Sequence, residues 1–251
     1  MSFNTQTGVL SGTPTELWPQ TSYMVWANNS GGSSTAYLNI TVVDQLPTIA
    51  YSASNLLLTN NTSSTDLPLV PTLTGAGEIT SWAINASLPA GLTFETSNGT
   101  IWGTPTELWN TTAYIVWANN SGGSSVAYLN ITVIDQLPTS LTYTPENVTM
   151  VRDEASTDLP LVPALTGPGE ITSWAINGSL PSGLSFGTTN GTIWGVPLVN
   201  MTTTTYTVWA NNTGGSLSAT INVTVLEPAV MLDYNPENMT LIRGVQMATL
   251  F

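Results

Sequence analysis

The chain contains no cysteine, no histidine and no lysine. It has two arginines and 15 acidic residues, for a formal net charge of -13. Without cysteine there is no disulfide framework and no thiolate metal site. Without histidine and lysine, the commonest catalytic base and the amine nucleophile are missing. So few cationic side chains disfavour nucleic acids and anionic membranes as partners, because both need lysine or arginine to neutralise phosphate.

Other features that proteins commonly use are also absent. No segment approaches 18 apolar residues and none resembles a signal peptide, so we expect no membrane contact within this sequence. There is no sustained helical periodicity and no glycine-rich phosphate loop opening a helix. A carboxylate pair could still serve a glycosidase, but the adjacent acids Asp153 and Glu154 occur in one copy of the repeat only. The sequence therefore predicts that the protein is not an enzyme.

What the chain does contain is a long internal repeat. A stretch reading Tyr-x-Val-Trp-Ala-Asn-Asn-Ser/Thr-Gly-Gly occurs three times, and its tryptophans are Trp26, Trp117 and Trp209. Trp117 follows Trp26 by 91 positions, and Trp209 follows Trp117 by 92. The segments 66–71 and 81–85 recur at 158–163 and 173–177. Self-similarity at a fixed long period is typical of tandem domains.

The phase of the repeat predicts the domain boundaries. Each copy ends in a valine-rich strand, after which a proline follows at position 47, 138 or 228. We therefore expect complete units at 47–137 and 138–228, the C-terminal part of a unit at 1–46 and the N-terminal part of another at 229–251. On this interpretation the sequence is a window on a longer array. The alternative is that the partial units complement one another between subunits.

Alternation with a period of two residues predicts an all-β fold. In the segment 36–43, apolar Ala36, Leu38, Ile40 and Val42 share one face, as expected for a half-buried strand. Clusters of Gly, Pro, Asn and Ser separate the strands at short spacing. We expect each unit to be an antiparallel β-sandwich of about seven strands, with Trp82 or Trp174 as its central buried indole.

Three motifs in succession resemble a known family. Leu-Pro-x-Gly-Leu-x-Phe begins at Leu88 and Leu180, Asn-Gly-Thr-Ile-x-Gly follows at Asn98 and Asn190, and the Trp-Ala-Asn-Asn segment closes each set. Together they resemble the tandem putative Ig-domain repeat, a cadherin-like and Ig-like module of large archaeal and bacterial surface proteins. The resemblance implies a sandwich that serves as a spacer, stalk or adhesin module, without catalytic residues.

The tryptophans depart from that family, which commonly has a small polar residue at these places. If Tyr114, Val116 and Ala118 point inward, Trp117 points outward, and Ile101 inward likewise leaves Trp102 outward. We therefore expect a pair of surface indoles in each unit. They either pack under a neighbouring loop or domain, or form a stacking platform for sugars or for an adjacent array. The candidates for stacking are Trp26, Trp102, Trp117, Trp194 and Trp209.

Asparagine glycosylation carries the strongest functional signal. The chain has 22 asparagines, and 16 of them begin an Asn-x-Ser/Thr acceptor motif, or sequon, where chance would give about 6. They are Asn28, Asn39, Asn60, Asn61, Asn85, Asn98, Asn110, Asn119, Asn130, Asn147, Asn177, Asn190, Asn200, Asn211, Asn222 and Asn238. Charged residues make up only 7% of the chain, so covalent glycans would solvate its surface. No acid lies two positions before any of these asparagines, which favours an archaeal or eukaryotic glycosylation machinery over the known bacterial one.

Calcium is a weaker candidate. Each linker between units offers one acid, Asp44 or Asp135, whereas calcium takes six to eight oxygens with several carboxylates converging. A solvated turn acid is the alternative, so we expect no resident cofactor apart from covalent N-glycans.

These observations predict a structural, heavily N-glycosylated extracellular filament or surface stalk. Its expected partners are copies of itself or neighbouring repeats, and glycans. The alternative function is a carbohydrate-binding adhesin that uses the exposed tryptophan faces.

Overall fold

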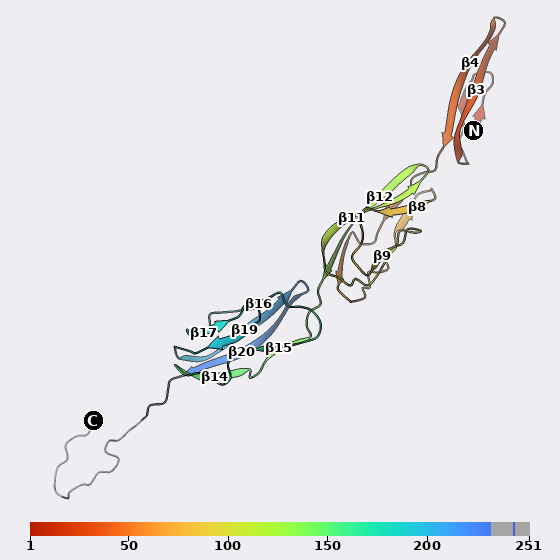
Figure 1. Ribbon diagram of the computed structural model, residues 1–251. Coiled ribbons are helices and arrows are strands. Elements are labelled where there is room, and N and C mark those ends of the chain that lie inside the picture. Colours follow the sequence, from red (N-terminus) through yellow and green to blue (C-terminus); the bar gives the residue numbers. More distant parts are fainter. Residues whose placement is uncertain (232–242, 244–251) are drawn as a thin grey trace. The chain divides into compact units, whose positions relative to one another are not determined.

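The computed structural model describes residues 1–231 and 243, and every regular element among them is a β-strand. The chain divides into two compact units, Met1–Gln136 and Leu137–Phe251. Figure 1 shows the strands of both units and labels many of them.

The first unit begins with paired segments and continues into an Ig-like sandwich. Its strands are β1 (Ser2–Phe3), β2 (Leu10–Ser11), β3 (Trp18–Asn29), β4 (Gly32–Val42), β5 (Thr48–Ala50), β6 (Asn55–Thr59), β7 (Thr72–Thr74), β8 (Ser81–Ile84), β9 (Leu92–Phe94), β10 (Ile101–Gly103), β11 (Trp109–Asn120) and β12 (Gly123–Ile134). β6, β12, β11 and β8 form one sheet in that order, and the pairs β5–β7 and β10–β9 face it across the core. A bridge between Leu69 and Ile101 connects the second layer.

The second unit repeats this arrangement. Its strands are β13 (Ser140–Tyr143), β14 (Asn147–Val151), β15 (Pro163–Thr166), β16 (Ser173–Ile176), β17 (Leu184–Phe186), β18 (Ile193–Gly195), β19 (Met201–Asn212) and β20 (Gly215–Leu226). The larger sheet has the order β14-β20-β19-β16, and Leu161 bridges to Ile193 in the other layer. The part of the chain that we expected to begin a further domain, 229–251, lies almost entirely outside the described residues.

Alternation along the long hairpins builds each core, as the sequence predicts. On β11, Tyr114, Val116 and Ala118 are completely buried, and Ile101 on β10 meets them from the other layer. Trp82 and Trp174 are each 7% exposed, which confirms them as core indoles. Burial of one large aliphatic side chain contributes about 1.5–3 kcal/mol to the free energy of unfolding. Each sandwich is therefore stabilised mainly by the one cluster of buried side chains between its two layers.

The repeated Asn-Gly-Thr-Ile motif positions the buried indole. Gly99 has φ +75°, which favours glycine, and a Cβ placed there would lie under 3.0 Å from the Trp82 ring. The Tyr51 hydroxyl donates to the Gly99 carbonyl at 2.5 Å. Gly191 and Trp174 repeat this contact in the second unit. The glycine therefore lets backbone lie directly on the indole face.

The sandwiches differ from the expected pattern in strand number and in one pairing. Each has eight strands, because the first segment divides at about Ser54 between the two layers, as β5 and then β6. β6 pairs with the last strand, β12, in parallel, and β14 with β20 likewise, whereas the other pairs are antiparallel. The alternation pattern identifies strands but does not show that one segment serves both sheets.

The hairpin β3–β4 has the register of β11–β12 but an open inner face. Tyr23 is 41% exposed where its counterpart Tyr114 is fully buried, and Leu38 is 39% exposed against 2% for Leu129. Among the described strands, β3 and β4 pair only with each other, so no second layer buries these side chains. Within the described residues no strand covers this face of the hairpin, and the boundaries of the partial unit stay a prediction.

Candidate functional site

The candidate acceptor asparagines lie at the protein surface. Of the 16 sequons, 15 fall within the described residues, and none of their asparagines is fully buried. Five are partly buried, namely Asn60, Asn119, Asn130, Asn211 and Asn222. Asn238 lies outside the described residues.

In four sequons the side-chain oxygen is occupied while the nitrogen faces solvent. After β8, the Asn85 Oδ1 accepts the Ile115 N–H at 2.9 Å, and Asn177 accepts the Thr207 N–H at 3.0 Å in the same way. In the turn before β10, the Asn98 Oδ1 accepts the Thr100 N–H at 3.0 Å, and Asn190 repeats this at 3.1 Å. Each Nδ2, the atom that would carry a glycan, has no hydrogen-bond partner among the described residues. The fold therefore holds these four amides in fixed orientations toward water.

Four asparagines on the long hairpins, Asn119, Asn130, Asn211 and Asn222, use amide atoms in hydrogen bonds. The Asn130 Nδ2 donates to Asn55 Oδ1 at 2.8 Å, and Asn222 donates to Asn147 at the same distance. The Asn119 Oδ1 accepts the Ser124 hydroxyl at 2.5 Å. An N-linked glycan leaves one N–H on the amide, so attachment at these sites is compatible with one retained donor bond.

Two sequons are less suited to modification. The Asn200 side chain is held between charged groups, with Oδ1 accepting from the Arg152 guanidinium at 3.0 Å and Nδ2 donating to Glu227. Asn60 is partly buried, and its Oδ1 is a buried acceptor without a partner. Sequence alone does not distinguish these two from the exposed acceptors.

The surface tryptophans of each complete domain lie on two different layers. Trp102 and Trp194 are 48% and 45% exposed, whereas Trp117 and Trp209 are only partly exposed. Because Ile101 and Val116 enter the same core from opposite layers, Trp102 and Trp117 project from opposite faces of the sandwich. The same holds for Trp194 and Trp209. Trp26 is 57% exposed on β3.

The outer face of the larger sheet differs between the two complete units. In the first unit Trp117 pairs with Val126, and Ile115 pairs with Tyr128, which is 68% exposed. In the second unit Trp209 pairs with Ser218, and threonines replace the other two positions. The first unit therefore presents an apolar strip beside the candidate acceptors Asn119 and Asn130.

The linker acid Asp44 has a structural role. Its Oδ1 accepts the Gln45 N–H at 2.9 Å and its Oδ2 accepts the Glu78 N–H at 3.0 Å, so both carboxylate oxygens bind backbone. In the described part of the chain, no three His, Cys, Asp or Glu side chains are grouped so that they could hold a metal ion. Sequence reasoning treated this residue as a candidate ligand or a solvated turn acid and missed its contact with the next domain.

The remaining acids among residues 1–231 lie in loops and turns. Asp153 and Glu154 follow β14 in a turn, as expected, and Asp153 pairs with Arg152 at 3.2 Å. Within residues 1–231 and 243 there is no helix with the length and hydropathy that crossing a membrane requires.

Comparison with known families identifies the two sandwiches. The model of the Putative Ig domain family matches residues 47–134 and again residues 136–226. The chain belongs to this family. Both matched segments contain the Asn-Gly-Thr-Ile turn beneath a buried tryptophan. The family is one of Ig-like repeats rather than of enzymes.

Curated relatives of these Ig domains are adhesins. The chain is 30% identical over 157 residues to a protein named "Serine-rich adhesin for platelets" from Staphylococcus aureus strain MRSA252, which covers 61% of this chain and 11% of the relative. The adhesin of the same name from strain MSSA476 also matches at 30%, over 6% of its length. The chain thus spans about a tenth or less of these relatives, all staphylococcal. It consists of tandem Ig-like repeats related to adhesin sequences.

Solved structures of tandem Ig and cadherin domains also align with this chain. A titin fragment, I67–I69, aligns over 84% of this chain and 75% of its own, with a TM-score of 0.38 and 14% identity. The N-terminal eight Ig domains of Down Syndrome Cell Adhesion Molecule align over 82% of this chain and 28% of their own. The TM-score is 0.46 and the sequence identity is 15%. A protocadherin gamma B7 fragment aligns over 83% of this chain and 58% of its own, with a TM-score of 0.31 and a sequence identity of 13%.

Proposed function

We propose that the chain is a glycan-coated structural segment of an extracellular stalk or filament, in which Ig domains in series provide reach. The observation that carries this proposal is the orientation of Asn85, Asn98, Asn177 and Asn190. At equivalent positions of both domains, the fold binds the side-chain oxygen and presents the nitrogen to solvent.

The composition gives the glycans a physical task. Only 7% of the residues are charged, and apolar side chains such as Tyr128 lie on outer sheet faces. The acidic residues give the chain a net charge of -13, but they are too few to cover these apolar patches. A hydrated glycan on each repeated acceptor covers such patches, keeps neighbouring chains apart where contact is unwanted and hinders proteases sterically.

Glycosylation itself needs no catalytic group from this chain. The asparagine Nδ2 forms a bond to the anomeric carbon of a lipid-pyrophosphate-linked oligosaccharide, the lipid pyrophosphate leaves, and the amide nitrogen loses one proton. A transferase supplies the base and the metal. Because no acid lies two positions before any acceptor, we propose a transferase of the archaeal or eukaryotic kind.

Each Ig domain carries its own core, so the mechanical behaviour follows from the repeat. The clusters around Trp82 and Trp174 share no residue, and the stability of such arrays is a sum over units and nearest-neighbour contacts. Additional copies lengthen the array without changing its local stability. The partners of this function are neighbouring repeats or further copies of the chain.

A second function is favoured by the exposed indoles. Trp102 and Trp194 occupy equivalent positions, and each is nearly half exposed on the layer opposite the larger sheet. Indole faces stack on the apolar faces of sugar rings. On this alternative the chain is an adhesin module that binds foreign carbohydrate through one tryptophan per domain.

One experiment separates the two functions. The full chain is prepared with its native glycans and after their enzymatic removal, and both forms are tested for self-association by sedimentation and for binding to a carbohydrate array. The structural proposal predicts that removal of the glycans increases association and that neither form binds the array. Binding that disappears in the W102A/W194A variant would instead establish the adhesin.

A further inference from the structure

The hairpin tip of each Ig domain is a preformed receptor for the linker that enters the domain. In the first complete domain, the tip between β11 and β12 holds residues 44–47. The Ser121 hydroxyl accepts the Asp44 N–H at 2.9 Å, and the Asn120 Nδ2 donates to the Gln45 carbonyl at 2.6 Å. The Ser125 hydroxyl donates to the Pro47 carbonyl.

Two glycines make this contact sterically feasible. A Cβ at Gly122 would lie under 3.0 Å from the Asp44 carbonyl oxygen, and one at Gly77 would collide with the Gln45 carbonyl in the same way. Leu46 then covers Gly123, with its Cδ1 at 3.6 Å from the position of an added Cβ. The Asn-x-Gly-Gly sequence of the tip is therefore a binding motif for an extended Asp-Gln-Leu-Pro segment.

The tip has the same internal geometry in each repeat. The Asn120 Oδ1 accepts the Gly122 N–H at 2.8 Å, and Asn212 accepts from Gly214 at the same distance. In the second unit Leu137 lies over Gly215, at 3.4 Å from an added Cβ, as Leu46 lies over Gly123. The two complete domains therefore share both the internal hydrogen bond of the tip and the leucine that covers it.

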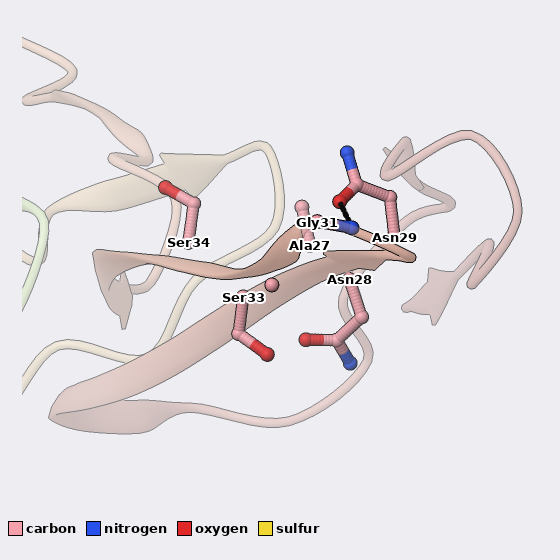
Figure 2. Close-up of a pocket in the computed structure, with 7 residues that line it drawn as sticks. Ala27, Asn28, Asn29, Gly31, Ser33 and Ser34 are labelled. Carbon is pink, nitrogen blue, oxygen red and sulfur yellow. Dashed lines mark hydrogen bonds between the residues drawn. The ribbon is translucent and has the colours of Figure 1, made fainter.

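The first hairpin carries this tip in an exposed state. The Asn29 Oδ1 accepts the Gly31 N–H at 2.7 Å, which Figure 2 shows as a dashed line. An added Cβ at Gly32 would meet no atom within 4 Å, and residues 27–29 and 31–34 line an open depression of about 490 Å³. The Asn29 Nδ2 and the hydroxyls of Ser30 and Ser34 have no partner among the described residues.

We propose that the tip at Asn29–Ser34 binds the Asp-Gln-Leu-Pro linker of another repeat unit. By the correspondence of positions, Ser30 accepts the linker aspartate N–H, Asn29 donates to the glutamine carbonyl, and Ser34 donates to the proline carbonyl. Gly31 takes the place of Gly122 beneath the aspartate carbonyl. The contact docks successive repeats through polar backbone recognition, and it does not depend on glycosylation.

The residues that line this depression favour a peptide over other ligands. They are alanine, asparagine, glycine and serine, without a carboxylate for a cation, an arginine for an anion or an aromatic ring for a sugar. Neutral amides and hydroxyls in a fixed array match the alternating N–H and C=O groups of an extended chain.

The test extends the full chain at Met1 with a copy of residues 41–91, which supplies the linker and front strands in the register of the repeat. We expect a nuclear Overhauser effect between the linker leucine methyls and the Gly32 Hα. The amide hydrogen of the linker aspartate should also exchange with solvent at least tenfold more slowly than in a control extension whose linker contains Gly-Gly. The native contact between Leu46 and Gly123 is the internal standard.

Two matched variants give the test its specificity. In Gly31→Ala the new Cβ meets only the Asn29 Oδ1, at 3.2 Å, so the tip is retained while the linker carbonyl is blocked. Ser33→Ala changes the same tip, but its counterpart Ser124 bonds Asn119 rather than the linker. The proposal requires loss of the signal in Gly31→Ala and its retention in Ser33→Ala.

A second measurement tests the proposal even if the extended chain fails to fold. The unextended chain is titrated with the octapeptide of residues 41–48 to about 10 mM, a concentration that detects millimolar affinity. Amide shifts at Gly31, Gly32 and Ser34 that vanish in Gly31→Ala support the proposal. A signal that survives Gly31→Ala, or the absence of both signals, overturns it.

Discussion

Replacement of Gly99 by alanine tests the link between the repeated turn and the buried tryptophan. Alanine at φ +75° costs about 1–2 kcal/mol. Its Cβ would lie under 3.0 Å from the Trp82 ring, and overpacking of this kind costs about 1–3 kcal/mol more. We therefore expect Gly99→Ala to lower the free energy of unfolding of the first sandwich by about 2–5 kcal/mol.

The assay is calorimetric unfolding of the full chain. For a domain of this size, 1 kcal/mol shifts Tm by about 4–8 °C, so one transition should move by at least about 8 °C while the other stays. Gly178→Ala is the matched control, because its φ is not positive and its Cβ would lie 3.7 Å from the Tyr206 ring. A Gly99→Ala shift no larger than that of the control would refute the reasoning.

Three further predictions concern pH, the exposed indoles and the apolar strip. Burial raises the pKa of Tyr51, so its stabilising contribution is complete below about pH 10, where the unfolded tyrosine ionises, and declines as the pH rises further; Tm measured from pH 8 to 11 should fall only above that point, and a flat profile would contradict this. Trp102→Ala and Trp194→Ala should each lower the free energy of unfolding in denaturant by about 1–2 kcal/mol, because these side chains are only about half buried; a core-sized loss of about 3–5 kcal/mol would show that they are buried in solution. If a glycan on Asn130 rests on the exposed ring of Tyr128 two positions earlier on the same face, Tyr128→Thr should lower Tm of the glycosylated form by more than that of the sugar-free form; equal shifts would exclude the contact.

Alternation and repeat phase were sufficient to predict the framework of this protein. The side chains that point inward include Tyr114, Val116 and Ala118, and the two core indoles are Trp82 and Trp174. In a strand that is buried on one face, every second side chain must be apolar and point into the core. The same rule was incomplete for the surface tryptophans. Alternation shows that Trp102 and Trp117 both point outward, but not that their strands belong to opposite layers.

Tertiary contacts account for what sequence reasoning missed. The role of Asp44 depends on Glu78, which is 34 residues away and contributes a backbone N–H that any residue would provide. The need for glycine at position 122 comes from the approach of the linker, and the motif alone indicates only a turn. The acceptor asparagines could be named from sequence, but the difference between Asn85 and Asn60 depends on what surrounds each amide.

Intact mass and glycopeptide mapping of the native protein test the central claim most directly. The polypeptide has a mass of 26.5 kDa, and we predict added mass with glycan at Asn85, Asn98, Asn177 and Asn190 and the lowest occupancy at Asn60. Unmodified asparagine at those four positions would contradict the account, and the exposed tryptophans would then be the remaining basis for a function.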